Sequence, residues 1–166
     1  MKKIYIAGPD VFEAHSIETG KEYSSLCNKY GYIGLYPLDN VVDFEQEKKK
    51  IAMDIFLANK KLIDECDIVL ANINSFRGKE ADSGTVWECG YAYGIGKKVI
   101  AYMESKRDYK EQFDNAKVID GVYWDEENRF IEDFNHPINL MIACSSIEIV
   151  QGGFEEGLKY IIETIK

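Results

Sequence analysis

The amino-acid sequence predicts a doubly wound α/β fold, in which helices cover both faces of a five-stranded parallel sheet. Short apolar runs that are rich in β-branched residues recur along the chain, as expected for buried strands. Segments with helical patterning or helix-capping residues separate most of these runs, and such alternation is typical of parallel sheets. The length of 166 residues suits a single domain, spanning residues 1–166, with one sizeable core.

The first part of the chain already alternates between the two kinds of element. Residues 3–7 are β-branched or aromatic and end at a Gly-Pro pair, which predicts a strand. A helix is expected at 13–30, closed by a glycine, followed by a second strand at 33–36. Residues 38–47 are acidic and turn-like, and we interpret them as an active-site loop. An amphipathic helix at 51–65 completes this part.

The middle of the chain continues the pattern. Residues 68–71 read Ile-Val-Leu-Ala, a short apolar run that predicts a buried strand. A polar loop with an Arg-Gly pair follows, and then a helix is expected at 83–96. Residues 99–103 form the fourth predicted strand.

The last part is harder to interpret. Residues 105–134 carry mixed charges, with a short helix expected around 109–113. A short helix at 137–143, a fifth strand at 147–150 and a closing helix at 154–165 complete a flavodoxin-like arrangement.

The helix predicted at 83–96 contains one unusual carboxylate. Asp82 supplies N-cap chemistry at its start, and Glu88 is the only charged residue within it. At about 3.6 residues per turn, Glu88 shares a face with Tyr91 and Ile95, so we expect that face to be buried. Because burying an unpaired carboxylate costs several kcal/mol or raises its pKa, Glu88 has either a structural partner (Tyr or Lys) or a chemical role.

The carboxyl ends of the strands define the expected ligand site. In doubly wound sheets, ligands bind beyond these ends. That rule brings together residues 8–12, residues 72–82 and the start of the helix that carries Glu88. Glu88 and Asp82 should therefore converge on one cleft. Their six-residue spacing puts them on different helix faces, so we expect them to play different parts.

Composition excludes several function classes. The formal net charge is −9 and no basic stripe is present, which argues against a nucleic-acid partner. No apolar run approaches the roughly 18 residues that a membrane span needs, so we expect a cytoplasmic protein with no membrane partner. The four cysteines lack a C-x-x-C spacing and the two histidines are isolated. We therefore expect neither a metal nor a cofactor, and no catalytic histidine.

Three separated motifs carry a family resemblance. They are Asp82-Ser-Gly-Thr-Val-Trp-Glu88-Cys-Gly-Tyr-Ala, Ile4-Tyr5-Ile-Ala-Gly-Pro9 and Pro137-Ile-Asn139-Leu-Met141. The first is similar to the D-[SC]-G-T-x-x-E-x-G-x-A signature of the nucleoside 2-deoxyribosyltransferase family, and the other two resemble further segments of that family. The resemblance covers most of the chain in the right order and implies the same flavodoxin-like fold.

The resemblance implies roles for three residues. Glu88 would be the nucleophile that attacks the anomeric carbon of a 2′-deoxynucleoside, expels the base and forms a covalent deoxyribosyl ester. A second base would then attack from the opposite face, with overall retention. Tyr5 would orient Glu88 through its hydroxyl, and Asp82 would bind a deoxyribose hydroxyl. Without the resemblance, Tyr5 reads as an ordinary strand aromatic and Asp82 as a helix cap.

Substrate-binding residues are expected from the strand ends and from the resemblance. Gly8 and Phe12 lie in the loop after the first strand, where the ligand is expected, and we expect Phe12 to stack on the base because aromatic faces hold any base. The resemblance implies the others. Asn59 stands where many members have an Asp that contacts the base; Asn cannot donate a proton as an acid, so the group that protonates the leaving base stays open. Asn139 and Met141 match residues donated by a neighbouring subunit, which implies a homo-oligomer built from dimers with shared sites. If the chain is monomeric, they belong to a short helix packed on its own core.

Two alternatives remain at this stage. A 2′-deoxynucleoside 5′-monophosphate N-hydrolase would use Glu88 with water, but the acidic residues Asp10 and Glu13 after the first strand would repel a phosphate. A non-catalytic nucleotide-binding module predicts no special role for Glu88. Arg77 is a loop anchor, an interface contact or a substrate ligand. Base choice rests on loop geometry, so the sequence does not separate purines from pyrimidines.

Overall fold

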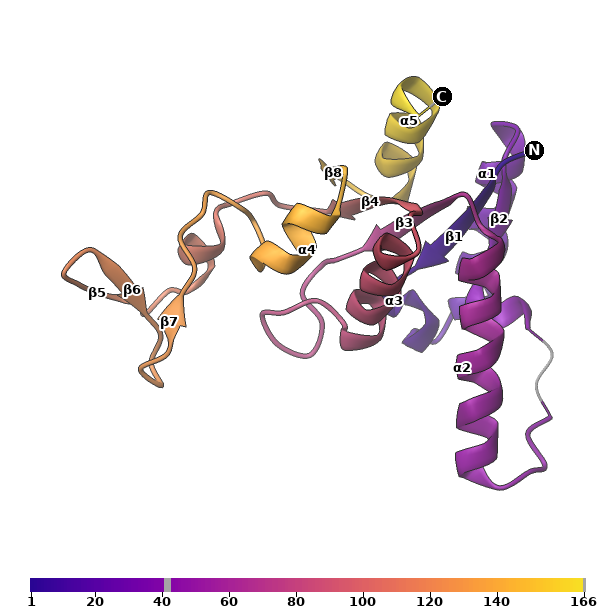
Figure 1. The fold of residues 1–166 in the computed structure, drawn as a ribbon, viewed down its shortest axis with the longest axis horizontal. Coiled ribbons are helices and arrows are strands. Elements are labelled where there is room, and N and C mark those ends of the chain that lie inside the picture. Colours follow the sequence, from indigo (N-terminus) through magenta and orange to yellow (C-terminus); the bar gives the residue numbers. More distant parts are fainter. Residues whose placement is uncertain (41–42, 166) are drawn as a thin grey trace.

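A five-stranded parallel sheet forms the centre of the molecule (Figure 1). The computed structural model describes residues 1–40 and 43–165. The strands run in the order β2-β1-β3-β4-β8, and all four pairings are parallel. Their bounds are β1 Lys3–Ala7, β2 Ile33–Leu35, β3 Ile68–Asn72, β4 Lys98–Met103 and β8 Glu148–Gln151. This order confirms the predicted doubly wound, flavodoxin-like sheet.

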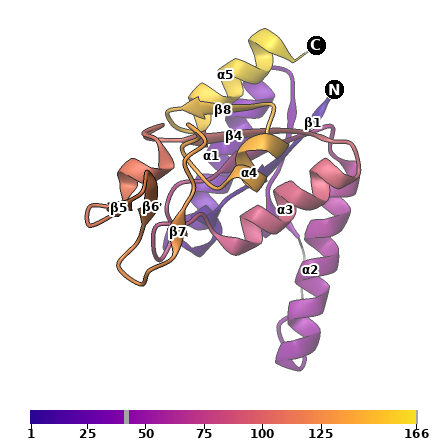
Figure 2. The same cartoon turned by 60° about the vertical axis from the view of Figure 1, so that its left-hand side comes forward.

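Helices cover both faces of this sheet (Figure 2). The α-helices are α1 Ser16–Lys29, α2 Lys48–Glu65, α3 Ser83–Gly94, α4 Leu140–Ser145 and α5 Phe154–Thr164. Short 3₁₀ turns are η1 Pro9–Phe12, η2 Pro37–Asp39 and η3 Tyr109–Gln112. One core cluster holds residues of α2, α3 and α4, and a second holds residues of α1 and α5.

Strand β3 illustrates why the sequence folds this way. Val69 and Ala71 belong to the cluster under α2, α3 and α4, while Ile68 and Leu70 belong to the cluster under α1 and α5. Side chains alternate across a strand, so a continuous apolar run fills both cores at once. Each such aliphatic side chain contributes about 1.5–3 kcal/mol when fully buried.

Several helix boundaries differ from those expected from the sequence. Helix α1 begins at Ser16 rather than at residue 13, because η1 occupies Pro9–Phe12 and Glu13 is extended. Helix α4 begins at Leu140 rather than at residue 137, because the Asn139 side chain accepts a hydrogen bond from the Met141 amide as an N-cap.

A small antiparallel sheet extends from the body of the molecule and was not expected from the sequence (Figure 1). It comprises β5 Lys117–Ile119, β6 Val122–Trp124 and β7 Phe130–Ile131. Asp120 and Gly121 join β5 to β6 with φ values of 51° and 80°. Positive φ at both positions is the requirement of a type I′ two-residue hairpin turn, which Asp-Gly satisfies.

Candidate active site

A cleft of about 480 Å³ lies beyond the carboxyl ends of β1 and β2, between α2 and the start of α3. Its walls are largely apolar, with a few polar side chains, as in most small-molecule sites. The apolar residues include Val11, Phe12, Ile17, Leu38, Phe44 and Ile55; the polar ones are Asn40, Asn59, Asp82, Thr85 and Glu88. Gly8 also lines the cleft. The expected active-site loop 38–47 contributes to it, although residues 41–42 lie outside the described part.

Glu88 is half-buried in this cleft and is held by Tyr5. The Tyr5 hydroxyl donates to Glu88 Oε1 at 2.5 Å. Tyr5 is fully buried on β1, on the face that α3 covers. Burial raises the pKa of Glu88 to about 7; the Tyr5 hydrogen bond lowers this pKa, and the negative charge of Asp82 raises it. Burial also raises the pKa of Tyr5, as does the Glu88 charge, so Tyr5 stays a proton donor.

The helix face around Glu88 is less buried than its spacing suggested. Ile95 is 42% exposed and Gly84 is also exposed, so the expectation of a buried α3 face is wrong. Glu88 loses part of its contact with water because it lies over β1 and against Tyr5, a residue from a distant strand. The pairing with a tyrosine matches the structural alternative, yet Glu88 also lines the cleft.

Asp82 is the N-cap of α3. Its Oδ2 accepts hydrogen bonds from the Thr85 amide at 2.9 Å and from Thr85 Oγ1 at 3.0 Å. Both bonds use the same oxygen, so the cap does not consume Oδ1. Because Asp82 lines the cleft together with Glu88, the two carboxylates converge as the sequence predicted.

Two asparagines form a pair on the opposite wall. Asn40 Nδ2 donates to the Pro37 carbonyl at 2.8 Å and to Asn59 Oδ1 at 3.1 Å. Because a carbonyl can only accept, it fixes the orientation of the Asn40 amide and, through it, that of Asn59. The pair therefore offers the cleft one acceptor, Asn40 Oδ1, and one donor, Asn59 Nδ2. Sequence reasoning found Asn59 but missed Asn40.

Phe12 lines the cleft and forms an aromatic wall with Phe76, which lies behind it and does not line the cleft. Its ring stacks on Phe76 at a centroid distance of 5.5 Å and an interplanar angle of 19°. The Arg77 guanidinium lies 4.7 Å from the Phe76 centroid and 5.3 Å from that of Phe12. Arg77 also has a φ of 50°, which is uncommon outside glycine. Of the three readings of Arg77, these contacts favour the loop anchor.

Comparison with known proteins follows this geometry. The family model described as nucleoside 2-deoxyribosyltransferase matches residues 4–141, which is most of the chain. The chain belongs to the nucleoside 2-deoxyribosyltransferase family. It is thus an enzyme of the pentosyltransferase class, as the sequence motifs predicted. No curated protein sequence matches the chain.

Solved structures agree with this assignment. A 2-deoxyribosyltransferase from Leishmania mexicana is 29% identical, with a TM-score of 0.81, and all of both chains is covered. The 2-deoxyribosyltransferase from Bacillus psychrosaccharolyticus is 20% identical with a TM-score of 0.59, covering 90% of this chain and 86% of that one. A conserved protein from Enterococcus faecalis is 22% identical with a TM-score of 0.61, covering 98% of each chain. The last two similarities establish the fold.

The remaining two residues matched to the nucleoside 2-deoxyribosyltransferase motifs lie outside this cleft. Asn139 caps α4, and its Nδ2 donates to Glu132 Oε1 at 2.6 Å. Met141 is 72% exposed and lines a separate cavity of about 300 Å³ between α3 and α4. The chain therefore does not bring Asn139 and Met141 together with its own Glu88.

The acidic residues after β1 do not face the deoxyribosyltransferase cleft. Asp10 is buried, with Tyr23 and Asn72 as hydrogen-bond partners, and Glu13 lines a different cavity of about 600 Å³. The expectation that both acids repel a phosphate at the site is therefore wrong. A better argument against phosphate is that no Lys or Arg stands among the described residues that line the cleft.

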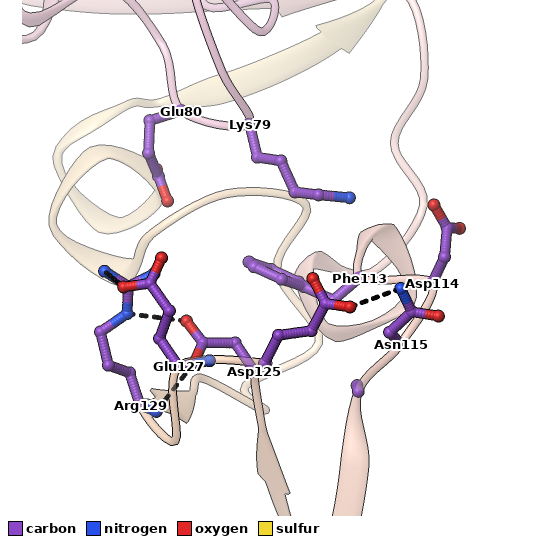
Figure 3. A pocket seen from close by; sticks show the side chains of 10 residues that line it. Lys79, Glu80, Phe113, Asp114, Asn115, Asp125, Glu127 and Arg129 are labelled. Carbon is purple, nitrogen blue, oxygen red and sulfur yellow. Dashed lines mark hydrogen bonds and ion pairs between the residues drawn. The ribbon is translucent and has the colours of Figure 1, made fainter.

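A third cavity, of about 530 Å³, lies between the loop at Lys79 and Glu80 and the small sheet (Figure 3). Its lining is acidic, with five carboxylates against Lys79 and Arg129. Arg129 pairs with Asp125 at 2.8 Å and with Glu127 at 3.0 Å. This cavity shares no lining residue with the cleft of Glu88.

Within residues 1–40 and 43–165, no three His, Cys, Asp or Glu side chains are grouped to hold a metal ion. In the same residues, no helix is long and apolar enough to cross a membrane.

Proposed function

We propose that this enzyme exchanges the base of 2′-deoxynucleosides through a covalent intermediate on Glu88. The observation that carries the proposal is the 2.5 Å hydrogen bond from Tyr5 to Glu88 Oε1 in a cleft of nucleoside size. A carboxylate with a pKa of about 7 is partly ionised at neutral pH, and it is a stronger nucleophile than an ordinary exposed carboxylate.

The reaction has two balanced steps. In the first, the Glu88 carboxylate forms a bond to C1′ while the bond from C1′ to the base breaks, and the base nitrogen keeps the electron pair and gains a proton. In the second, a nitrogen of the incoming base attacks C1′, the ester bond breaks, and that base loses its proton. Two inversions give overall retention. Tyr5 holds the carboxylate in the orientation for both attacks.

The Asn40–Asn59 pair is suited to the base. An amide donor and an amide acceptor match a base edge that offers one acceptor and one donor. Asn59 Nδ2 would hydrogen-bond a ring nitrogen and stabilise the charge that develops as the base leaves. Because an amide does not release its proton, Asn59 is not the acid that protonates the leaving base.

Asp82 is suited to the sugar. Its Oδ1, which the helix cap does not use, would accept from a deoxyribose hydroxyl beside Glu88. Gly8 and Phe12 would form the neighbouring wall, with Phe12 stacked on the base.

We further propose that the active site is shared between subunits of a homo-oligomer built from dimers. Asn139 and Met141 would reach the sugar site of a neighbouring copy. This is supported by the exposure of Met141 and by the position of both residues outside their own chain's cleft. A two-fold axis would supply the contact twice, once to each site.

The proposed role is nucleoside salvage in the cytoplasm, with residues 1–166 acting as one domain and without a metal or cofactor. The cysteines Cys27, Cys66, Cys89 and Cys144 are free, in keeping with a reducing compartment.

The proposal of a single domain is supported by contacts between the small sheet's segment and the main body. They are the hydrogen bonds from Lys79 to the Gln112 carbonyl and from Tyr109 to Glu80.

An exchange assay tests the function. The enzyme is incubated with 2′-deoxyinosine, with and without free adenine, and products are separated by chromatography. We expect 2′-deoxyadenosine to form only when adenine is present, and Glu88→Gln to reduce its rate by orders of magnitude. A parallel incubation contains 2′-deoxyinosine 5′-monophosphate in place of the nucleoside. Release of hypoxanthine only from this monophosphate would instead support the hydrolase. No product from either the nucleoside or the monophosphate would support a binding module.

A further inference from the structure

A chain of hydrogen bonds runs across the carboxyl ends of the strands beside the cleft. Tyr23 on α1 donates to Asp10 Oδ1 at 3.2 Å, and Asn72 Nδ2 at the end of β3 donates to Asp10 Oδ2 at 3.0 Å. Asn72 Oδ1 accepts from the Asn74 amide at 3.1 Å, and Asn74 Oδ1 accepts from the Glu104 amide at 2.9 Å. This series of hydrogen bonds therefore links α1, η1, β3 and the end of β4.

The donor and acceptor roles along this series of hydrogen bonds require an acceptor at position 10. The Asn74 amide can only donate, so it fixes Asn72 with Oδ1 towards itself and Nδ2 towards Asp10. Asp10 is only 8% exposed, so a residue there without an acceptor would leave the Asn72 donor unpaired in a largely dry environment. Burial and the Asp10 charge raise the pKa of Tyr23 to about 12, so Tyr23 also stays a donor.

The bond between Asp10 and Asn72 joins the two segments that build the aromatic wall. Phe12 lies two residues after Asp10, and Phe76 lies four residues after Asn72, and their rings stack. Gly8 packs into the same junction. A Cβ at position 8 would overlap Asp10 Oδ2 and approach Asn72 Cβ to 2.9 Å. Neither Asp10 nor Asn72 lines the cleft itself, so both act through the residues that do.

We infer that Asp10 is a positioning residue that, through Asn72, aligns Phe12 for stacking on the nucleobase. The inference rests on the proposed function for the identity of the ligand. It assigns a role to a buried carboxylate that takes no part in the transfer steps. It also predicts that hydrogen-bonding capacity, rather than charge, is what position 10 must supply.

Binding of 2′-deoxyinosine tests this inference, measured by calorimetry in the Glu88→Gln background, in which turnover does not interfere. Asp10→Ala is expected to weaken binding about tenfold, as for the loss of one base–aromatic stacking contact. Asn72→Ala removes the same bond from the other side and should have the same effect, which keeps the test available if one variant does not fold. Asp10→Asn should restore most of the affinity, because its Oδ1 can accept from Asn72 while its Nδ2 donates to the oxygen of the Tyr23 hydroxyl, which can accept as well as donate.

A double-mutant cycle separates positioning from general destabilisation. If Asp10 acts through Phe12, Phe12→Ala and Asp10→Ala together should bind within about twofold of Phe12→Ala alone. The matched control is Asp67→Ala, which removes a carboxylate that accepts from the Lys3 amide at the amino ends of β1 and β3, and it should leave affinity unchanged.

Three results would each overturn the inference. The first is that the affinity losses of Phe12→Ala and Asp10→Ala multiply in the double variant. The others are an Asp67→Ala variant that loses as much affinity as Asp10→Ala, and an Asp10→Asn variant that binds as weakly as Asp10→Ala. So would the absence of nucleoside binding. The proposed function fails separately, if the unmodified enzyme binds 2′-deoxyinosine but forms no exchange product.

Discussion

Replacing Glu88 with Gln should stabilise the folded protein at alkaline pH while it removes catalysis. Burial raises the pKa of Glu88 from 4.5 to about 7, so ionising this carboxyl costs more in the folded than in the unfolded chain. Gln has nearly the same shape, keeps an oxygen that can accept from the Tyr5 hydroxyl, and carries no charge.

The sign and the size of the effect follow from this pKa. Between pH 4.5 and about 7 the folded chain binds more protons at Glu88 than the unfolded chain, so stability falls as pH rises through that window. At about 1.4 kcal/mol per pH unit, the difference between the two pKa values corresponds to about 3 kcal/mol. The free energy of unfolding of Glu88→Gln minus that of the wild type should therefore be about 3 kcal/mol larger at pH 8 than at pH 4.5.

Urea unfolding followed by tryptophan fluorescence measures this difference. Both proteins are unfolded at pH 4.5 and pH 8, at one protomer concentration, and compared through the free energy of unfolding. Glu22→Gln, a change at an exposed position on α1, is the matched control and should show no gain with pH. If Glu88→Gln shows the same stability relative to wild type at both pH values, the raised pKa of Glu88 is wrong.

Three further predictions concern catalysis. Tyr5→Phe removes a hydrogen bond to the charged form of Glu88, which is worth about 1.5–3 kcal/mol. The midpoint of the acidic limb of the kcat/KM–pH profile should therefore rise from about 7 by about one to two pH units. An unmoved midpoint would contradict the role of Tyr5. The enzyme should turn over 2′-deoxyinosine about 100-fold faster than inosine at equal concentration, because an extra hydroxyl beside Glu88 must find both space and partners; similar rates would refute this. Mixing inactive Glu88→Ala and Asn139→Ala chains should restore about a quarter of wild-type activity after subunit exchange, since half of randomly formed dimers carry one intact site. A fully active monomer would rule out the shared site.

Local sequence signals predicted the fold because strand and helix patterns along the chain are strong and short-range. The run Ile68 to Ala71 fills both cores, as continuous apolar runs do in parallel sheets. The same reasoning predicted a common cleft for Glu88 and Asp82, because the carboxyl ends of parallel strands share one edge of the sheet.

Features that depend on contacts through space were not accessible in this way. Asn40 reaches the cleft because the Pro37 carbonyl orients it, and its position in an acidic loop gave no sign of that bond. Asp10 turns away from the cleft because Tyr23 and Asn72 both donate to it. The bond from Asn40 to Pro37 is local, but the bonds from Asn40 to Asn59 and from Asn72 to Asp10 join residues 19 and 62 positions apart.

The small sheet is a different case, since a local signal for it was present. Asp120-Gly121 is a strong hairpin dipeptide, and both residues have the positive φ that the turn requires. The flanking strands β5 and β6 have only three residues each, and every residue of β5 is exposed. Such short strands lack the alternation that identifies a half-buried strand, so the turn had no periodic pattern on either side of it.

The central claim, a covalent deoxyribosyl ester on Glu88, is tested most directly by mass spectrometry of the enzyme itself. The protein is incubated with 2′-deoxyinosine without an acceptor base, quenched in acid, and measured intact and after proteolysis. We predict an added mass of one deoxyribosyl group on the peptide that contains Glu88, its disappearance when adenine is added before the quench, and its absence in Glu88→Gln. Base exchange by the wild-type enzyme with no adduct, or with the adduct on another residue, would contradict the account.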